Sequence, residues 1–323
     1  MKKCSVIGCG RMFQLHHHQN LVKCKYEIDE IFDPRKKLLK KISVKLNIKK
    51  SFSNFTKFLE NNSSKEFFFF LPRDISYYFL KRLLKKKNIS VFIEKPPVLY
   101  KENFTRIIKL LKKNNNKLFI GYMFRYSHAL KRLKSAVSKH QIKNIKKVYC
   151  EMSLNYDLKK NKYITFDEKI SKTYTEKKIN NKIKNIINYK VFLNRYSHVI
   201  NLIYYLLKSF KVDEIVSTDF FNYKLFLKKN NTKIFINLNN DLNYRVKLDF
   251  YLHNKKEIKL NFNFNNKIFN TLYSEKNGQN VKKIKLKDDL YFNEINEFSS
   301  INKKKYVEQL SNFNNTLKLC EKI

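Results

Sequence analysis

The chain has 323 residues, of which 43% are hydrophobic and 15% aromatic. This is enough apolar surface for two domain cores, so the composition excludes wholesale disorder and a small disulfide scaffold. Lysine and arginine exceed aspartate and glutamate by 69 − 27 = 42, a balance that ordinarily favours a nucleic acid or an anionic membrane as partner.

The first third of the chain alternates short apolar runs with helical patterns, which is typical of β-α-β units in a parallel sheet. The expected strands are residues 5–7, 27–32, 67–71, 91–93 and 117–121. The expected helices are residues 11–23, 34–46, 75–87 and 101–113. We therefore predict an α/β domain with a doubly wound parallel sheet and helices on both of its faces.

Two glycines stand where the first expected strand turns into the first helix. Gly8 and Gly10 permit a tight turn and a close approach of backbone to phosphate, which the helix N-terminus attracts. Asp33 lies 33 − 10 = 23 residues after Gly10, where a carboxylate can accept hydrogen bonds from an adenosine ribose. The structural alternative is an ordinary turn with Asp33 as the helix N-cap before Pro34. Phe13 occupies the position of the third glycine of the dinucleotide-binding pattern.

Glu94 and Lys95 directly follow a buried strand, so they lie at the carboxyl edge of the sheet, where open α/β sheets bind ligands. Pro96 permits a cis peptide bond that could aim Lys95 into the crevice. A surface ion pair between Glu94 and Lys95 explains the same residues equally well.

Beyond Gly121 the pattern changes to period-two segments, which predict an open, mainly antiparallel sheet. The expected strands are residues 145–156, 214–223, 233–238, 244–252, 257–264 and 281–286, with a hairpin turn at 253–256. We expect helices at 128–137 and 189–207 and at the C-terminus, and a mobile loop at 157–188. The chain thus divides into a dinucleotide-binding domain, residues 1–121, and an α+β domain, residues 122–323.

Asn194, His198 and Asn201 share one face of the helix expected at 189–207, because they are spaced at i, i+4 and i+7. Such a polar stripe either lines a wet pocket or is satisfied by the neighbouring sheet. Histidine accepts protons near neutral pH, so a functional stripe would carry out acid-base chemistry on a hydroxyl or carbonyl. The run from His16 to His18 cannot bind one metal ion, because consecutive helical side chains point about 100° apart.

Cysteine usage and apolar run lengths bear on the compartment. Five cysteines without a CxxC pair argue against a disulfide framework and a zinc site, and the apolar runs fall far below the ~18 residues of a membrane span. We therefore expect a cytoplasmic protein with no metal and no membrane partner. The scarce residues have GC-rich codons and the lysines are spread along the whole chain, so we expect a solvated basic surface and no specific nucleic-acid partner.

Several segments resemble the Gfo/Idh/MocA oxidoreductases, the family of glucose-fructose oxidoreductase and inositol dehydrogenase. They are SVIGCGRMFQLH at 5–16, FDPR at 32–35, FFFFLP at 67–72, VFIEKPPV at 91–98, GYMFRYSHALKRLK at 121–134, NRYSHVINLIYYL at 194–206 and YFNEINEFSSI at 291–301. The EKP element at 94–96 and its distance from the glycine turn are the most specific of these features.

The resemblance implies a Rossmann domain that binds NAD or NADP, and a second domain that holds the substrate and mediates homo-oligomerisation. It implies that Lys95 reaches the substrate hydroxyl and that His198 is the catalytic histidine, with Asn194 beside it. Asn194 and Asn201 stand where many members carry aspartate. The cofactor-binding residues that it implies are Gly8, Gly10, Arg11, Met12, Asp33, Arg35, Pro72, Glu94, Lys95 and Pro96.

We therefore expect an NAD(P)-dependent oxidoreductase acting on a secondary alcohol or ketone of a sugar, polyol or sugar nucleotide. His198 would accept the hydroxyl proton and Lys95 would stabilise the developing oxyanion. Asp33 favours NAD and Arg35 can accommodate the 2′-phosphate of NADP, so both cofactors stay open. Two alternatives remain: a noncatalytic NAD(P)-binding homologue, suggested by Phe13 and the two asparagines, and a polyanion-binding protein, suggested by net charge alone.

Overall fold

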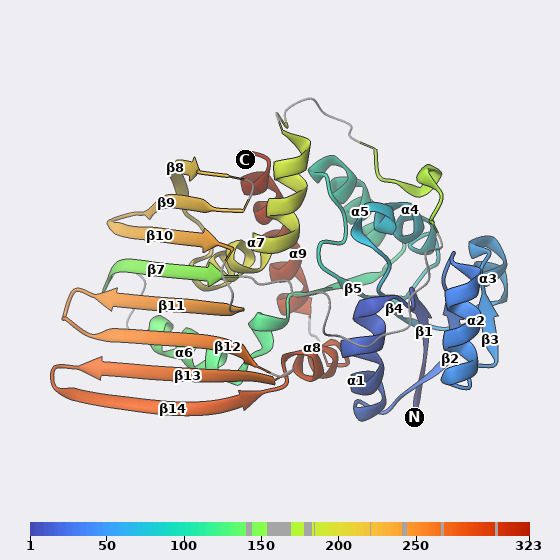
Figure 1. The fold of residues 1–323 in the computed structure, drawn as a ribbon, viewed down its shortest axis with the longest axis horizontal. Helices are drawn as coiled ribbons and strands as arrows, with labels where there is room; N and C mark the ends of the chain where they lie inside the picture. Colours follow the sequence, from blue (N-terminus) through green and yellow to red (C-terminus); the bar gives the residue numbers. More distant parts are fainter. Residues whose placement is uncertain are drawn as a thin grey trace. The chain divides into compact units, whose positions relative to one another are not determined.

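The computed structural model describes residues 1–139, 144–153, 169–177, 183, 185–219, 221–240, 244–265, 268–300 and 303–323. The chain forms two compact units, each built around a sheet of its own (Figure 1). The first unit comprises the described residues of Met1–Gly121, Lys159–Lys182 and Glu294–Leu317, and the second unit comprises those of Tyr122–Leu158, Ile183–Asn293 and Lys318–Ile323. The assignment of functional domains to residues 1–121 and 122–323 stays a prediction.

The described part of the first unit contains a six-stranded sheet in the order β3-β2-β1-β4-β5-β6, with every neighbouring pair parallel. This is the strand order of the doubly wound dinucleotide-binding fold. The strands are β1 (Lys2–Ile7), β2 (Tyr26–Phe32), β3 (Lys50–Phe52), β4 (Glu66–Phe69), β5 (Ser90–Glu94) and β6 (Lys117–Gly121). The helices are η1 (Phe13–His17), α1 (His18–Lys23), α2 (Lys36–Lys45), α3 (Phe55–Asn61), α4 (Arg73–Leu83), α5 (Lys101–Lys113) and η5 (Lys172–Tyr174), with parts of α8 (Leu290–Phe298) and α9 (Lys303–Cys320).

Aromatic side chains fill the core of the first unit. Residues 67–69 of β4 are fully buried phenylalanines, as expected for a parallel strand that is covered on both faces. Phe298 of α8 packs edge-on against Phe68, Phe92 and Phe119, with ring centroids 5.2, 6.0 and 5.7 Å away. These contacts place the end of α8 against three neighbouring strands of the sheet.

The second unit contains an eight-stranded sheet within its described residues, in the order β14-β13-β12-β11-β7-β10-β9-β8. Only the β7 and β10 pair is parallel among these neighbours. The strands are β7 (Ile145–Ser153), β8 (Lys211–Ser217), β9 (Tyr223–Lys229), β10 (Thr232–Asn239), β11 (Arg245–Leu252), β12 (Glu257–Asn265), β13 (Ile268–Asn277) and β14 (Asn280–Asp288). The helices are η2 (Met123–Tyr126), α6 (His128–Lys139) and α7 (Ile186–Leu207).

The fold class expected from the sequence is confirmed in both units: a doubly wound parallel sheet and a large, mainly antiparallel one. The sequence reading missed β3 and α3, which have three and seven residues and are too short for a periodic pattern. It also missed β9 and β13. The mobile loop expected at 157–188 falls largely outside the described residues. Within that range, residues 172–174 form η5, and α7 begins at Ile186.

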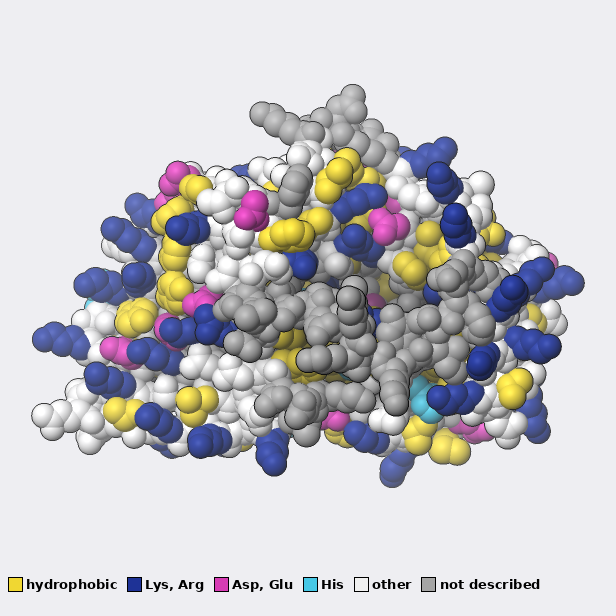
Figure 2. All heavy atoms as spheres, viewed as in Figure 1, with side chains coloured by type: hydrophobic (Ala, Val, Ile, Leu, Met, Phe, Trp, Pro, Cys, Tyr) yellow, Lys and Arg dark blue, Asp and Glu magenta, His cyan; other side chains and the backbone are white. Residues whose placement is uncertain are grey.

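The surface and the cysteines agree with the compositional reading. Lysine and arginine side chains are scattered over the face shown in Figure 2, and no single patch collects them there. The five cysteines, all described, are free thiols, and only Cys24 among them is not buried. In the part of the chain that the structure describes, no helix has the length and apolar character needed to cross a bilayer.

Candidate functional site

Two glycines form the turn after β1. Gly8 has a φ of +98°, and a Cβ there would lie 2.6 Å from the backbone nitrogen of Leu71, so only glycine fits. The N–H of Gly8 donates to the carbonyl of Phe32 at 2.7 Å, which ties the turn to the end of β2. A Cβ on Gly10 would lie 3.2 Å from Nη2 of Arg35. The guanidinium of Arg35 therefore lies directly against the glycine turn.

Asp33 joins this turn to the start of α2. Its fully buried carboxylate accepts hydrogen bonds from the N–H of Cys9 at 2.9 Å and from the N–H of Arg35 at 2.9 Å. It also accepts from Nε and Nη2 of Arg35 at 2.9 and 2.8 Å. A carboxylate without water needs such donors and a cation to stay charged. The N-cap residue of α2 is Arg35, so Asp33 organises the turn and the arginine but does not cap the helix.

Phe13, in the place of the third glycine, is a core side chain. It has no exposed surface and stacks on Phe70, with ring centroids 5.9 Å apart. Directly after its first two residues this helix contains the π-helical turn η1, which is wider than an α-helical turn. A small residue normally lets this helix lie close to the strand, and the wider turn accommodates a ring instead.

The glycine turn has the donors that a dinucleotide phosphate requires. Arg11 and Met12 are the first helical residues and are half-buried. The leading N–H groups of a helix have no partner inside it, and its N-terminus carries a partial positive charge. The arginine at 35 adds a cation beside Gly10, so the chain's own residues fit a pyrophosphate here. Pro72 is exposed and is the N-cap residue of α4, after the neighbouring strand β4.

Lys95 lies in the turn after β5. This strand ends at Glu94, which is aligned with Gly121 of β6, and the peptide bond between Lys95 and Pro96 is cis. The N–H of Lys95 donates to Oε2 of Glu94 at 3.2 Å. Burial lowers the pKa of the Lys95 amine to about 8, opposed by the Glu94 carboxylate and assisted by the nearby cation of Arg73. An amine with such a pKa can donate and accept a proton close to neutral pH.

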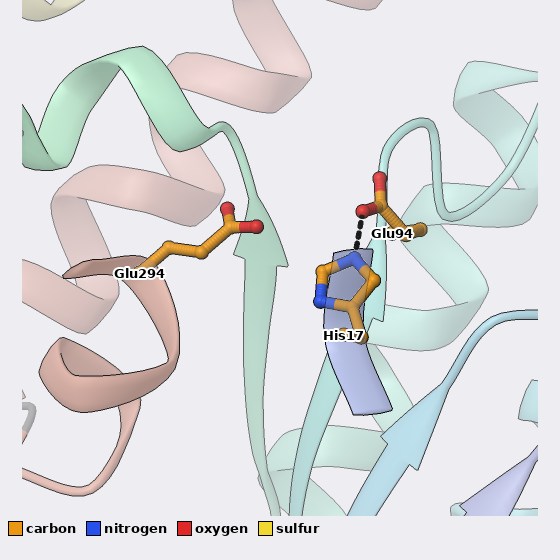
Figure 3. A group of neighbouring side chains, drawn as sticks. All are labelled: His17, Glu94 and Glu294. Carbon is orange, nitrogen blue, oxygen red and sulfur yellow. Dashed lines mark hydrogen bonds and ion pairs between the residues drawn. The ribbon is translucent and has the colours of Figure 1, made fainter. Parts of the chain in front are cut away.

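Glu94, which is half-buried, also belongs to a cluster with the buried residues His17 and Glu294, shown in Figure 3. Nε2 of His17, from η1, lies 2.5 Å from Oε1 of Glu94, and Glu294 extends from α8 toward this pair. One ligand-type atom from each residue lies within 4.8 Å of the other two. Two ligands of one zinc ion stand about 3.3 Å apart. The contact between His17 and Glu94 is therefore a hydrogen bond, and the absence of a metal from this protein stays a prediction.

The histidine of the polar stripe on α7 lies in the second unit. His198 is 9% exposed, and its ring is edge-on to Tyr122 and Phe124, with centroids 5.7 and 5.4 Å away. Asn194, one turn earlier, is half-buried. The aromatic rings restrict the orientation of the imidazole, and Asn194 shares its helix face.

Asn201 contacts a neighbouring element of the same unit. It is fully buried, and its Oδ1 accepts a hydrogen bond from Nη1 of Arg125 at 3.4 Å. The guanidinium carbon of Arg125 lies 4.4 Å from the ring centroid of Tyr205. Asn201 is thus satisfied by another side chain of the protein, an arginine of η2, which favours a structural role over a place in a wet pocket.

The predicted site residues divide between the units. The first unit contains Lys95 and all the expected cofactor-binding residues, and the second contains Asn194 and His198. The structure brings the glycine turn, Asp33 and Arg35 together. That Lys95 and His198 act on one substrate stays a prediction. Sequence reasoning did not associate His17 and Glu294 with Glu94, because nothing in their spacing links the three.

Comparisons with known proteins agree with this fold. The family model for the Gfo/Idh/MocA oxidoreductases, described as an oxidoreductase family with an NAD-binding Rossmann fold, matches residues 2–122. No curated protein matches the chain in sequence.

Three solved structures are similar over nearly the whole chain. A dehydrogenase from Clostridium difficile has a TM-score of 0.74 at 16% identity, covering 99% of this chain and 98% of that one. A 3-ketoreductase from Actinomadura kijaniata, in complex with NADP and TDP-benzene, has a TM-score of 0.75 at 12% identity, covering 98% and 95%. A dehydrogenase from Chromobacterium violaceum has a TM-score of 0.76 at 11% identity, covering 100% and 94%. At these identities the likeness shows a shared fold.

Proposed function

We propose that the chain is an NAD(P)-dependent dehydrogenase or reductase, because the model of the Gfo/Idh/MocA oxidoreductase family with its NAD-binding Rossmann fold matches residues 2–122. Its substrate is a secondary alcohol or ketone of a sugar, polyol or sugar nucleotide. The observation that carries the proposal is the Lys95 amine, which lies at the carboxyl edge of the parallel sheet with its pKa lowered to about 8. This is the edge where such sheets bind their ligands.

The cofactor-binding residues divide by task. Gly8, Gly10, Arg11 and Met12 bind the pyrophosphate, and Pro72, Glu94 and Pro96 line the nicotinamide pocket. Asp33 and Arg35 contact the adenosine ribose. Because four N–H groups already donate hydrogen bonds to the Asp33 carboxylate and its charge is paired with Arg35, the site accepts a 2′-phosphate. We therefore propose that NADP binds at least as tightly as NAD.

When bound, the nicotinamide accepts or supplies the hydride, and the chain's residues handle the proton. In alcohol oxidation the substrate carbon loses a hydride while its hydroxyl proton passes to the imidazole of His198. The Lys95 ammonium donates a hydrogen bond to the developing oxyanion, and the Asn194 amide orients the hydroxyl. In ketone reduction the oxygen gains a proton from the same pair of residues. An asparagine cannot accept the proton, so the acid-base role falls to His198 and Lys95.

The experiment is a nucleotide titration followed by turnover assays. NADPH and NADH fluorescence measures binding, and a panel of sugars, polyols and sugar nucleotides then measures turnover. Lys95→Ala should lower kcat by roughly 10²–10⁴ with nucleotide binding and thermal unfolding retained. Lys85 is an exposed lysine in the turn after α4. Lys85→Ala is the matched control and should leave kcat unchanged. Equal kcat values for Lys95→Ala and wild type would contradict the assigned role.

A noncatalytic NAD(P)-binding protein is the second candidate. It is favoured by the two asparagines of the stripe on α7, of which Asn201 already binds Arg125. It predicts NADPH binding with no turnover of any compound in the panel. We propose a cytoplasmic homo-oligomer in either case, to be tested by fractionation and by light scattering.

A further inference from the structure

A buried carboxylate outside the expected site binds the start of α5. Glu176 is 4% exposed and lies in residues 169–177, which belong to the first unit. Its Oε2 accepts a hydrogen bond from the N–H of Leu99 at 2.8 Å. Its Oε1 accepts from the N–H of Tyr100 at 3.2 Å and from Nδ2 of Asn103 at 2.8 Å. Three donors from one short stretch of chain therefore converge on this carboxylate.

The start of α5 needs such an acceptor. Its N-cap residue is Tyr100, whose side chain makes no cap hydrogen bond. Serine, threonine, aspartate or asparagine at this place would bind the leading N–H groups of the helix. Glu176 instead binds the N–H groups of Leu99 and of the N-cap residue Tyr100, which is 76 residues away in sequence. Its negative charge also suits the positive end of the helix dipole.

Contacts with α4 hold Glu176 in place. The N–H of Glu176 donates to the carbonyl of Asp74 at 2.7 Å. The ring of Tyr174 lies against Tyr78 and Phe79, with centroids 4.8 and 4.9 Å away. Figure 1 shows this short yellow-green helix, η5, beside α4. The position of residues 174–176 therefore depends on ring packing and a backbone hydrogen bond as well as on the Glu176 carboxylate.

The stretch that Glu176 binds is the far end of the Lys95 turn. Two prolines, Pro96 and Pro97, restrict φ in this turn, and the residues from Pro96 to Tyr100 are all buried. The near end is the end of β5, and the far end is bound by Glu176. A stiff segment attached at both ends leaves the backbone of Lys95 little freedom.

Burial and a neighbouring acid disfavour the ionised form of Glu176. Burial raises the pKa of Glu176 to about 7, although the three donors act in the opposite direction. The carboxylate of Asp74, on α4, also raises the pKa of Glu176. Burial and the Glu176 carboxylate in turn raise the pKa of the Tyr100 phenol, which lies at the start of α5. Arg73, next to Asp74, is the cation that helps to lower the pKa of Lys95. The first turn of α4 thus borders both Lys95 and Glu176.

We propose that Glu176 is a positioning residue whose carboxylate fixes the far end of the Lys95 turn and so sets the place and the burial of the Lys95 amine. The inference rests on the catalytic role proposed for Lys95. Glu176 contacts neither substrate nor cofactor and acts through the backbone of Leu99 and Tyr100.

The test compares the full-length wild type with Glu176→Gln and with the matched control Glu102→Gln, in the first turn of the same helix. Hydrogen exchange measures the amides of residues 98–104, and trace acetylation with acetic anhydride across pH measures the pKa of Lys95. In Glu176→Gln we expect roughly 10–100-fold faster exchange, because hydrogen bonds to a charged acceptor are lost. We expect the pKa of Lys95, taken as the midpoint of its acetylation profile against pH, to rise from about 8 toward the value of a solvated lysine. Glu102→Gln should change neither readout.

The direction of the Lys95 shift separates positioning from simple charge removal. Loss of a nearby negative charge would lower the pKa of Lys95, whereas release of the turn to water raises it. A rise accompanied by faster exchange supports the proposal. Faster exchange with an unmoved or lowered midpoint overturns it and leaves Glu176 a helix cap only. Unchanged exchange also overturns it.

Two further measurements keep the outcomes distinct. If Glu176→Gln does not fold, Asn103→Ala removes one of the three donors and is tested by the same two readouts with the same criteria. NADPH titration of the wild type tests the proposed function separately, because the acetylation midpoint requires neither cofactor nor substrate. A protein that binds no NAD(P)H but shows the Lys95 shift would refute the oxidoreductase and keep the role of Glu176 in the turn.

Discussion

The turn after β1 and the turn after β5 both lie at the carboxyl edge of the parallel sheet, and a buried carboxylate binds backbone N–H groups of each. At the first turn it is Asp33, which binds the N–H of Cys9. At the second it is Glu176, which binds the N–H groups of Leu99 and Tyr100. The two carboxylates do similar work in different electrostatic surroundings.

The difference lies in what compensates each charge. Asp33 has a cation, Arg35, two residues away, with two guanidinium hydrogen bonds. Glu176 has neutral donors, and its neighbour Asp74 is itself an acid. Burial therefore raises the pKa of Glu176 to about 7. The first turn thus depends on a local ion pair, whereas the second depends on a remote carboxylate whose raised pKa makes this turn sensitive to pH near neutrality.

The largest effect is expected from a side chain at Gly8. Gly8→Ala forces an L-residue into a φ of +98° and a Cβ to 2.6 Å from the backbone of Leu71. We expect the free energy of unfolding to fall by about 2–4 kcal/mol, measured in urea, with NADPH binding lost. Gly278→Ala, at φ +60° in open space, is the matched control and should lose only about 1 kcal/mol. Equal losses would show that the close approach does not constrain this turn.

A smaller effect is expected from Asp33→Asn, which removes the charge that binds Arg35. The guanidinium, 17% exposed, then lacks its carboxylate, and we expect a loss of about 2–3 kcal/mol in the free energy of unfolding. Asp29→Asn is the control, since its carboxylate meets Lys3 and Lys50 at the surface at 3.7 and 3.6 Å. That variant should lose less than about 1 kcal/mol. A comparable loss in both variants would contradict the importance of the buried pair.

A third effect is a pH dependence that should appear at the second turn. Because the pKa of Glu176 is raised from 4.5 to about 7, the folded protein holds a proton there that the unfolded chain has released. This contribution to stability is complete below pH 4.5 and is lost as pH rises to about 7. The unfolding free energy of wild type minus that of Glu176→Gln should therefore fall across this window, by at most about 1.4 kcal/mol per pH unit. A difference that is flat or that rises with pH would contradict the raised pKa.

Several parts of the site were predictable because their signals are local. Gly8, Gly10 and Asp33 stand at positions fixed by the strand-turn-helix order, and a neighbouring strand brings the carboxylate to the turn. Glu94 and Lys95 end a buried strand, which predicts their edge of the sheet. The same local reading could not assign Glu176 a role, because nothing in its sequence neighbourhood indicates a cap for a helix that begins 75 residues earlier.

Packing also decided how an exception to the pattern is accommodated. Phe13 departs from the dinucleotide-binding pattern, and the sequence alone left open whether it disrupts the turn. The structure buries the ring against Phe70 and widens the helix to a π-turn. His17, one of three consecutive histidines and the last residue of this π-turn, is the one that bonds Glu94.

Composition, periodicity and motif spacing by themselves determined that this chain forms a doubly wound sheet followed by a large antiparallel one, because burial patterns repeat within each element. They also determined which turn would carry the glycines and which the lysine. Only the tertiary structure decided that Arg35 lies against Gly10, that Glu294 approaches His17 and Glu94, and that Glu176 binds the start of α5. These are contacts between polar side chains and groups that other elements supply, and no period in the sequence encodes such a partner.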